Sequence, residues 1–365
     1  MVNNVTKLLV KYNDQEVGYL VEIDNKIAFQ YSESWIKNGF SISPISLPLI
    51  KKPFISNNEY LEGLFGVFYD SLRDGWGNLL IKRKMAQIGI NYDKLSPLTK
   101  LSLVGENGLG GLSYEPIQNN EEYLDYLDLD LIAKEADALF NLENVNVDID
   151  KMCALGGSSG GSRPKIHIKE NNEEWIIKFS CSYDPIGISE LEYNANALAK
   201  KCDINTNEFK YFISSSGNKY FGVKRFDRNK GRRVHMISLS SLLETSHTIP
   251  NLDYSHLFQV ISLICKDKND LYEAFKRMCF NVLFKNKDDH GKNFAFIYDE
   301  NIKGYRLSPF YDITQTKNKF DHEMTVNGNG NPIEDDLLFI ADKFKLSLDK
   351  CKTILNNIKK LLHLS

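Results

Sequence analysis

The sequence lacks the features that would assign it to a metal-cluster, disulfide-rich, membrane or DNA-binding class. Its 365 residues carry a formal net charge of −3, so no overall basic field indicates nucleic-acid binding. The six cysteines are scattered without a C-x-x-C pair, which favours reduced core thiols. No apolar run approaches the roughly 20 residues of a membrane span, and no signal-peptide pattern is present. We therefore expect a cytoplasmic protein without membrane contact.

The apolar patterns predict a mixed α+β chain. Its first 50 residues are typical of short strands, and its last third is mostly helical. The pattern predicts strands at 7–12, 17–23, 27–31, 165–169, 175–179, 211–214 and 219–223. It predicts helices at 60–73, 78–85, 129–142, 189–202 and 271–285, and two more within 333–362. Asp74–Gly77 is expected to break the first helical stretch, Asp130 to cap the helix at 129–142, residues 105–116 to connect two strands, and residues 118–122 to form a linker.

A glycine-rich stretch, L-G-G-S-S-G-G-S-R-P-K, occupies residues 155–165. Backbone N–H groups of such a loop can approach phosphates closely, because glycine has no Cβ and tolerates positive φ. It is not a Walker A motif, because Ile166 follows Lys165 where serine or threonine is required. A flexible linker is the alternative, although a strand pair follows at once.

Lysine within an apolar strand is uncommon unless it is paired or at an edge, and Lys178 lies in W-I-I-K-F. A kinase N-lobe places there the lysine that binds ATP phosphates and pairs with a helix glutamate. Glu192, near the start of the helix that follows, is the preferred partner. A surface lysine on an edge strand is the other interpretation.

The most informative stretch runs from 286 to 312. Asp288 and Asn293 have the D-x-x-x-x-N spacing of a kinase catalytic loop, in which the aspartate accepts the hydroxyl proton and the asparagine binds a metal ion. Asp312 follows two apolar runs, where a phosphotransferase places its second metal carboxylate. A hard cation such as Mg²⁺ prefers these oxygen ligands. An Asp- and Asn-rich stretch between apolar runs is also typical of a turn.

In this order, the motifs resemble those of the HipA family of serine/threonine kinases, toxins of bacterial toxin–antitoxin modules. The matching segments are 155–165, W-I-I-K-F, V-K-R-F-D-R at 223–228, K-D-D-H-G-K-N-F at 287–294 and S-P-F-Y-D at 308–312. The resemblance implies a two-lobed, protein-kinase-like α+β fold with a mixed N-lobe and a mostly helical C-lobe. It divides the chain into an N-terminal subdomain (1–115), the rest of the N-lobe (116–228) and a C-lobe (229–365).

The resemblance also implies ATP, Mg²⁺ and a set of site residues. Asp288 is the implied catalytic base, and Asn293 and Asp312 are the implied metal ligands. Ser158 matches a serine that family members autophosphorylate, with Ser159 as the alternative. The implied ATP-binding residues are Gly160, Gly161, Ser162, Arg163, Lys165, Lys178, Lys224, Arg225, Phe226, His290, Lys292 and Tyr311. The loop ends in Arg-Pro-Lys, where some members have Gln-Glu-Lys.

The implied activity is phosphorylation of a protein, with an aminoacyl-tRNA synthetase as one candidate substrate. The implied partner is a small helix-turn-helix antitoxin of HipB type, through which the chain would meet DNA indirectly. A small-molecule or lipid kinase would use the same residues. A non-catalytic scaffold that binds nucleotide or antitoxin is the third alternative.

Overall fold

The computed structural model describes residues 2–118, 127–141, 147–157, 160–316 and 318–364. Its contacts divide the chain into two compact units. The N-terminal unit comprises Met1–Glu190 and Glu208–His235, and the C-terminal unit comprises Leu191–Asn207 and Met236–Ser365. The division of the sequence at 115 and 228 remains a prediction.

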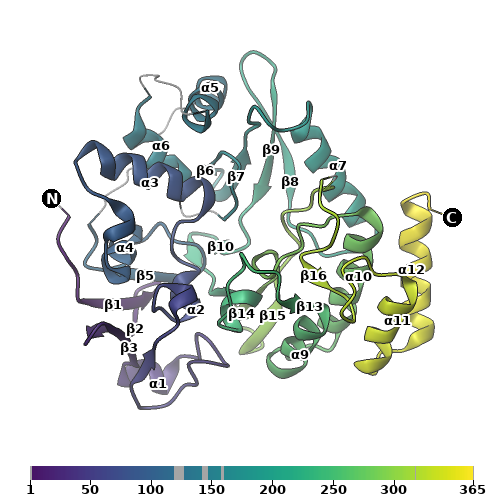
Figure 1. Cartoon of the computed structure of the whole chain (residues 1–365), viewed down its shortest axis with the longest axis horizontal. Coiled ribbons are helices and arrows are strands. Elements are labelled where there is room, and N and C mark those ends of the chain that lie inside the picture. Colours follow the sequence, from purple (N-terminus) through teal and green to yellow (C-terminus); the bar gives the residue numbers. More distant parts are fainter. Residues whose placement is uncertain (1, 119–126, 142–146, 158–159, 317, 365) are drawn as a thin grey trace. The chain divides into compact units, whose positions relative to one another are not determined.

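The described residues of the N-terminal unit form two larger antiparallel sheets and a short antiparallel pair, β10 (Arg228–Asn229) with β11 (Arg232–Arg233) (Figure 1). The first has the order β4-β3-β2-β1-β5, and the second has the order β6-β7-β9-β8. The strands of the first sheet are β1 (Lys7–Tyr12), β2 (Gln15–Ile23), β3 (Lys26–Tyr31), β4 (Phe54–Ser56) and β5 (Leu112–Glu115). Those of the second are β6 (Lys165–Glu170), β7 (Glu173–Lys178), β8 (Phe209–Ile213) and β9 (Lys219–Lys224). Alternating burial along β1 and β3 confirms that one face of the first sheet is core.

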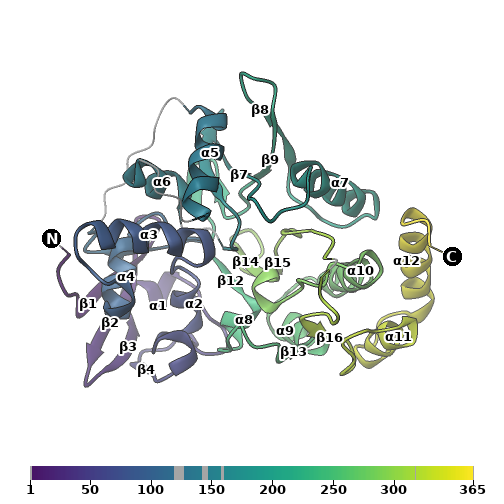
Figure 2. The same cartoon turned by 45° about the horizontal axis from the view of Figure 1, so that its top comes forward.

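Helices cover the sheets of this unit. They are α1 (Glu33–Asn38), α2 (Gly66–Tyr69), α3 (Gly75–Gln87), α4 (Pro97–Val104), α5 (Leu129–Phe140) and α6 (Ile149–Gly156). Helices α3 and α6 lie side by side in both views (Figures 1 and 2). Their apolar faces share one core with β6, β7 and β9, built around Trp76, Leu80 and Trp175.

The C-terminal unit is mostly helical. Its longer helices are α9 (Tyr254–Ile264), α10 (Asn269–Phe284), α11 (Glu334–Lys343) and α12 (Leu348–Leu361), and α7 (Ile188–Lys201) enters it from Leu191. A three-stranded sheet has the order β12-β14-β15, from strands β12 (Met236–Ser238), β14 (Ala295–Asp299) and β15 (Gly304–Leu307). The short strands β13 (Leu252–Asp253) and β16 (Met324–Thr325) pair in parallel. The predicted mixed and helical halves are confirmed.

Three local predictions were wrong. Asp74–Gly77 starts α3 instead of breaking a helix, because glycine at 75 and 77 allows the helix to approach Gly161 O and Gly157 O closely. Residues 60–73 form only short helical turns, including α2. The stretch 105–116 contains β5, and its residues 105–111 join α4 to that strand, so they connect a helix and a strand.

The predicted cap of α5 was also wrong by two residues. Asp128 is the N-cap, and its carboxylate accepts hydrogen bonds from the N–H groups of Asp130 and Leu131. The Asp130 carboxylate lies inside the first turn and accepts instead from Ser216, Asn218 and Tyr220 at 2.6, 2.9 and 2.7 Å. The predicted linker at 118–122 lies almost wholly outside the described residues.

Candidate functional site

The first part of the stretch singled out in the sequence, residues 286–294, forms a loop between α10 and β14. Asn293 ends a short 3₁₀ turn, Gly291–Asn293, and its side-chain amide donates to the backbone oxygen of Asp288 at 2.7 Å. The amide nitrogen is therefore committed to the loop, and the carbonyl oxygen is the atom of Asn293 that suits a hard cation. The two residues with kinase-like spacing are thus in direct contact.

The buried side chain of Asp289 anchors this loop to neighbouring segments. This side chain is fully buried, and Oδ2 accepts hydrogen bonds from Tyr254 Oη and His322 Nδ1, both at 2.8 Å. Oδ1 accepts from the backbone N–H of Glu323 at 3.0 Å. Asn281 extends the network by donating to Tyr254 Oη at 2.9 Å. These contacts fix the backbone of Asp288, whose own side chain remains 40% exposed.

Asp312 follows β15 on the second chain segment of this site. Its φ of 56° is in the left-handed region, which non-glycine residues seldom occupy and which is often retained at functional sites. The neighbouring Tyr311 hydroxyl donates to the backbone oxygen of Lys292 at 2.5 Å. This bond ties the segment of Asp312 to the loop of Asn293.

The donor set fits a nucleotide-bound cation better than an all-protein metal site. No group of three His, Cys, Asp or Glu side chains that could hold a metal ion occurs in the described parts of the chain. A cation held by Asn293 and Asp312 would need further oxygen ligands, which phosphate groups supply. His290, expected near a nucleotide, packs against His247 with ring centroids 5.9 Å apart.

The expected phosphate loop lies in the N-terminal unit and is packed against the start of α3. The backbone N–H of Trp76 donates to Gly161 O at 3.0 Å, and a Cβ on Gly75 would come within 2.1 Å of that oxygen. Arg163 pairs with Asp184 at 2.8 Å, and Lys165 donates to Gly160 O. The two cationic side chains therefore already shape the loop. Ser158 and Ser159 lie outside the described residues.

Lys178 ends β7, the strand between β6 and β9. It is in register with Lys165 on β6 and Phe221 on β9, so the expected phosphate-binding lysine and the loop's last residue are strand neighbours. The Glu192 residue is 2% exposed within α7. Pairing of Lys178 with Glu192 remains a prediction.

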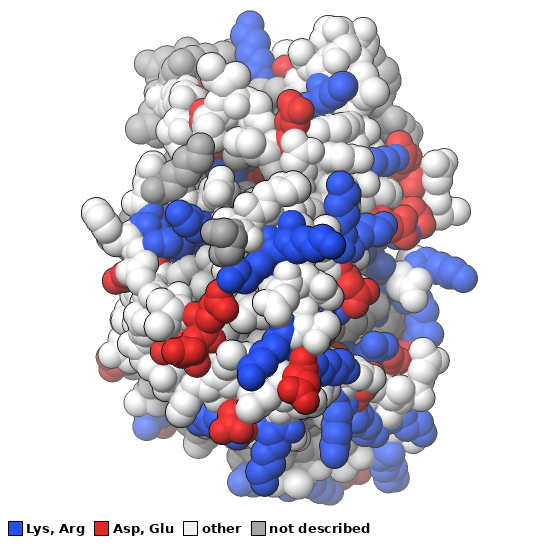
Figure 3. Space-filling model, turned by 90° about the vertical axis from the view of Figure 1, so that its right-hand side faces the viewer, with Lys and Arg blue, Asp and Glu red and all other residues white. Residues whose placement is uncertain are grey.

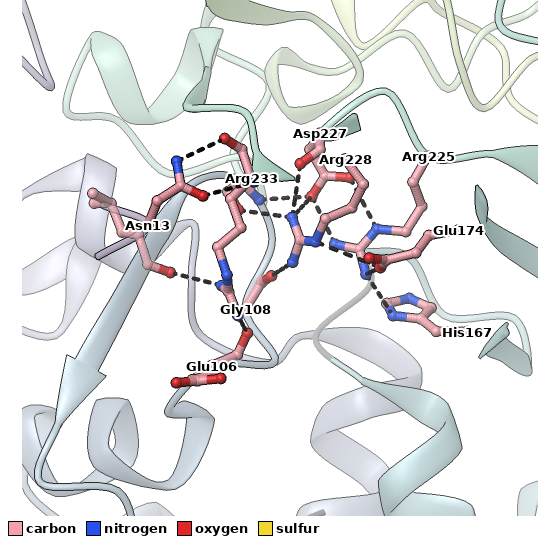
Figure 4. Close-up of polar contacts among 11 residues, drawn as sticks. Asn13, Glu106, Gly108, His167, Glu174, Arg225, Asp227, Arg228 and Arg233 are labelled. Atoms are coloured by element: carbon pink, nitrogen blue, oxygen red, sulfur yellow. Dashed lines mark hydrogen bonds and ion pairs between the residues drawn. The ribbon is translucent and has the colours of Figure 1, made fainter. Parts of the chain in front are cut away.

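The expected hinge, Lys224 to Phe226, leads into a buried ion network that the sequence analysis missed (Figure 4). Arg225 binds Asp227 through Nε and Nη2, at 2.9 and 2.7 Å, and contacts His167 Nδ1 at 2.9 Å. Arg228 joins Asp227 to the backbone oxygens of Gly108 and Gly110. Lys224 pairs with Glu173 and Glu208. The charged side chains of this stretch are therefore engaged in structural contacts.

The protonation states of this network follow from burial and charge. Burial would raise the pKa of Asp227, but Arg225 and Arg228 outweigh it and hold that pKa below its usual range. Burial, with the positive charge of Arg225, lowers the pKa of His167 well below its ordinary value. A neutral imidazole beside a guanidinium avoids a third buried cation.

Two known protein-family domains match most of this chain. The HipA N-terminal domain matches residues 8–115, and the HipA-like C-terminal domain matches residues 157–363. The chain belongs to the HipA family. The second HipA match contains residues 157–165 of the glycine-rich stretch, Lys178, Asp288, Asn293 and Asp312.

Individual relatives agree with this membership. The kinase candidate Y4dM of Sinorhizobium fredii is 21% identical over 94% of this chain and 87% of its own length. A kinase candidate of Haemophilus influenzae is 27% identical over 43% of this chain and 52% of its own. The fold matches HipA in a Shewanella oneidensis complex of HipA, HipB and operator DNA, with a TM-score of 0.75 and 19% identity, over 97% of this chain and 88% of that one. The two-lobed, kinase-like α+β fold expected for this chain is thereby confirmed.

No helix in the described residues is long and apolar enough to cross a membrane.

Proposed function

We propose that this HipA-family chain is a Mg²⁺- and ATP-dependent kinase that phosphorylates serine or threonine side chains of a protein. The observation that carries the proposal is the loop in which Asn293 binds the backbone of Asp288 while the buried Asp289 fixes its position. Catalysis of phosphoryl transfer depends mainly on positioning and on stabilising charge, so a fixed carboxylate and oxygen ligands are the parts it requires.

The residues divide the reaction between them. Asp288 would accept the proton of the acceptor hydroxyl as its oxygen bonds to the γ-phosphorus and the bond to the β-phosphate oxygen breaks. Asn293 and Asp312 would hold Mg²⁺, which neutralises charge on the phosphates when bound. Lys178 and the loop from Gly160 to Lys165 would bind the phosphates. His290, Lys292, Tyr311 and the stretch Lys224 to Phe226 complete the proposed nucleotide site.

A HipB-type antitoxin is the proposed partner, because the Shewanella relative is found with HipB on operator DNA. We assign DNA contact to that partner. The net charge of this chain is −3, and basic side chains on the face that carries α12 are interleaved with acidic ones (Figure 3). The protein substrate, for which an aminoacyl-tRNA synthetase is one candidate, follows from family membership alone.

The test is to treat purified, phosphatase-treated protein with Mg²⁺-ATP and to read its intact mass and phosphosite map, beside an Asp288→Asn control. A phosphate on Ser158 or Ser159 that is absent from the control is the expected result. Transfer to lipid or metabolite extracts without transfer to protein would point to the other kinase class. Nucleotide binding with no transfer to any acceptor would overturn the kinase proposal in favour of a scaffold.

A further inference from the structure

Lys319 lies directly beside the proposed catalytic base. It comes from the segment that follows Asp312, 31 residues after Asp288 in the chain. Its Nζ is 2.5 Å from Asp288 Oδ1 and 2.7 Å from Glu323 Oε1. This lysine lies outside the sequence motifs described above.

The surrounding contacts place Lys319 firmly. His322 and the backbone N–H of Glu323 bind the two oxygens of Asp289, at 2.8 and 3.0 Å. The N–H of Glu323 also lies 3.3 Å from Lys287 O. The stretch 319–323 is therefore bound to Lys287 and Asp289, the two residues that flank Asp288. The position of Lys319 Nζ thus does not depend on its long side chain alone.

Stability does not explain this ion pair. The side chains of Lys319 and Asp288 are 35% and 40% exposed, and ion pairs at such sites contribute only about 0–1 kcal/mol. Burial would lower the pKa of Lys319, but the carboxylates of Asp288 and Glu323 outweigh it and raise that pKa, so the ammonium stays charged at neutral pH. The pair uses Oδ1 of Asp288, so Oδ2 can face an acceptor hydroxyl.

We propose that Lys319 is the positioning residue of the phosphoryl-transfer reaction. It fixes the Asp288 carboxylate through Oδ1 and offsets its negative charge, which would otherwise repel the phosphates that must approach it. Glu323 holds the lysine from the other side. The inference rests on the proposed kinase function and adds a residue from outside its sequence motifs.

The expected effect is on turnover and not on nucleotide binding. Lys319→Met keeps the aliphatic stem but removes the charge, and should lower the maximal transfer rate by about 10- to 100-fold with the KM for ATP within about twofold. Lys319→Arg keeps the charge and should restore most of the rate. A lysine that only stabilised the fold would lower the melting temperature without this separation of kcat from KM.

The experiment measures phosphate transfer from radiolabelled Mg²⁺-ATP, over a range of ATP concentrations, to the chain itself and to dephosphorylated casein. Wild type, Lys319→Met, Lys319→Arg and Asp288→Asn are compared, with thermal unfolding of each. Lys359→Ala is the matched control, because Lys359 forms a comparable ion pair with Glu334 in the same unit, with side chains 22% and 47% exposed.

The outcomes separate the inference from the function on which it rests. A slow Lys319→Met, a restored Lys319→Arg and an unaffected Lys359→Ala support it. A Lys319→Met protein as fast as wild type would show that the pair is incidental, and a faster one would show that Lys319 blocks the base; either overturns the inference while the kinase function stands. No transfer by folded wild-type protein would overturn the kinase function itself.

Discussion

Replacing Asp227 with asparagine should lower the free energy of unfolding of the N-terminal unit by about 3–5 kcal/mol, the usual cost of removing one partner of a buried ion pair. The carboxylate accepts from Arg225 Nε and Nη2, Arg228 Nη1 and Gly110 N, all between 2.7 and 2.9 Å. An asparagine would turn an amide toward some of these donors. Glu174, 3.7 Å from Arg225 and 3.5 Å from Arg228, would be the remaining acid beside both guanidinium groups.

Urea unfolding followed by circular dichroism measures this loss, with the slope m as a check that the unfolded state is unchanged. Glu115→Gln is the control, because the Lys11–Glu115 pair at 3.0 Å has side chains 28% and 42% exposed and should cost no more than about 1 kcal/mol. An Asp227→Asn protein whose free energy of unfolding lies within about 1 kcal/mol of wild type at equal m would refute this prediction.

The same substitution should also change how the free energy of unfolding depends on pH in the acid range. Because the pKa of Asp227 is lower in the folded chain than its ordinary value near 3.9, its contribution is complete above that pH and is lost as pH falls through the folded value. Wild type should therefore lose stability more steeply below about pH 4 than Asp227→Asn. An equal loss of stability with falling pH in wild type and Asp227→Asn would show that the two arginines do not hold the carboxylate ionised.

Two further predictions concern buried groups of the N-terminal unit. Burial lowers the pKa of His235 to about 4, so the free energy of unfolding should fall as pH drops from about 6.5 to 4. In His235→Gln, whose amide can still donate to Ile42 O, that loss should be smaller by up to about 3 kcal/mol, as measured by denaturant unfolding at pH 7, 5 and 4. Equal losses in wild type and variant would contradict this. Gly157 has a φ of 54°, and a Cβ there would lie 2.6 Å from His167 Nδ1. Gly157→Ala should therefore be about 1–3 kcal/mol more destabilising than the control Gly217→Ala, because Gly217 has a φ of 88° but open space around it. Equal melting temperatures of the two variants would refute the predicted clash.

The spacing of apolar residues along the sequence correctly predicted several helices and hairpins. The hairpin β6–β7 and the helix α10 follow from alternating and helical spacing of apolar residues, and both are confirmed. The start of α3 could not be predicted, because the glycines that suggest a break are required by contacts with Gly157 and Gly161. The Gly110–Asp227 bond spans 117 residues and the Asp289–His322 contact 33, and no spacing within one motif encodes either.

The pair Asp288–Asp289 shows what structure adds to a motif. The two adjacent carboxylates are chemically alike; the D-x-x-x-x-N spacing selects Asp288, and the surroundings of the two side chains show separately which one suits a base and which an anchor. Both oxygens of Asp289 are committed to Tyr254, His322 and the N–H of Glu323 in a fully buried site, so this residue cannot accept a proton from an incoming hydroxyl without breaking the loop's support. Asp288 is 40% exposed and binds Lys319 through one oxygen. These contacts favour Asp288 over Asp289 in the proposed role of base, and we expect Asp288 to act in that role only while Asp289 remains buried.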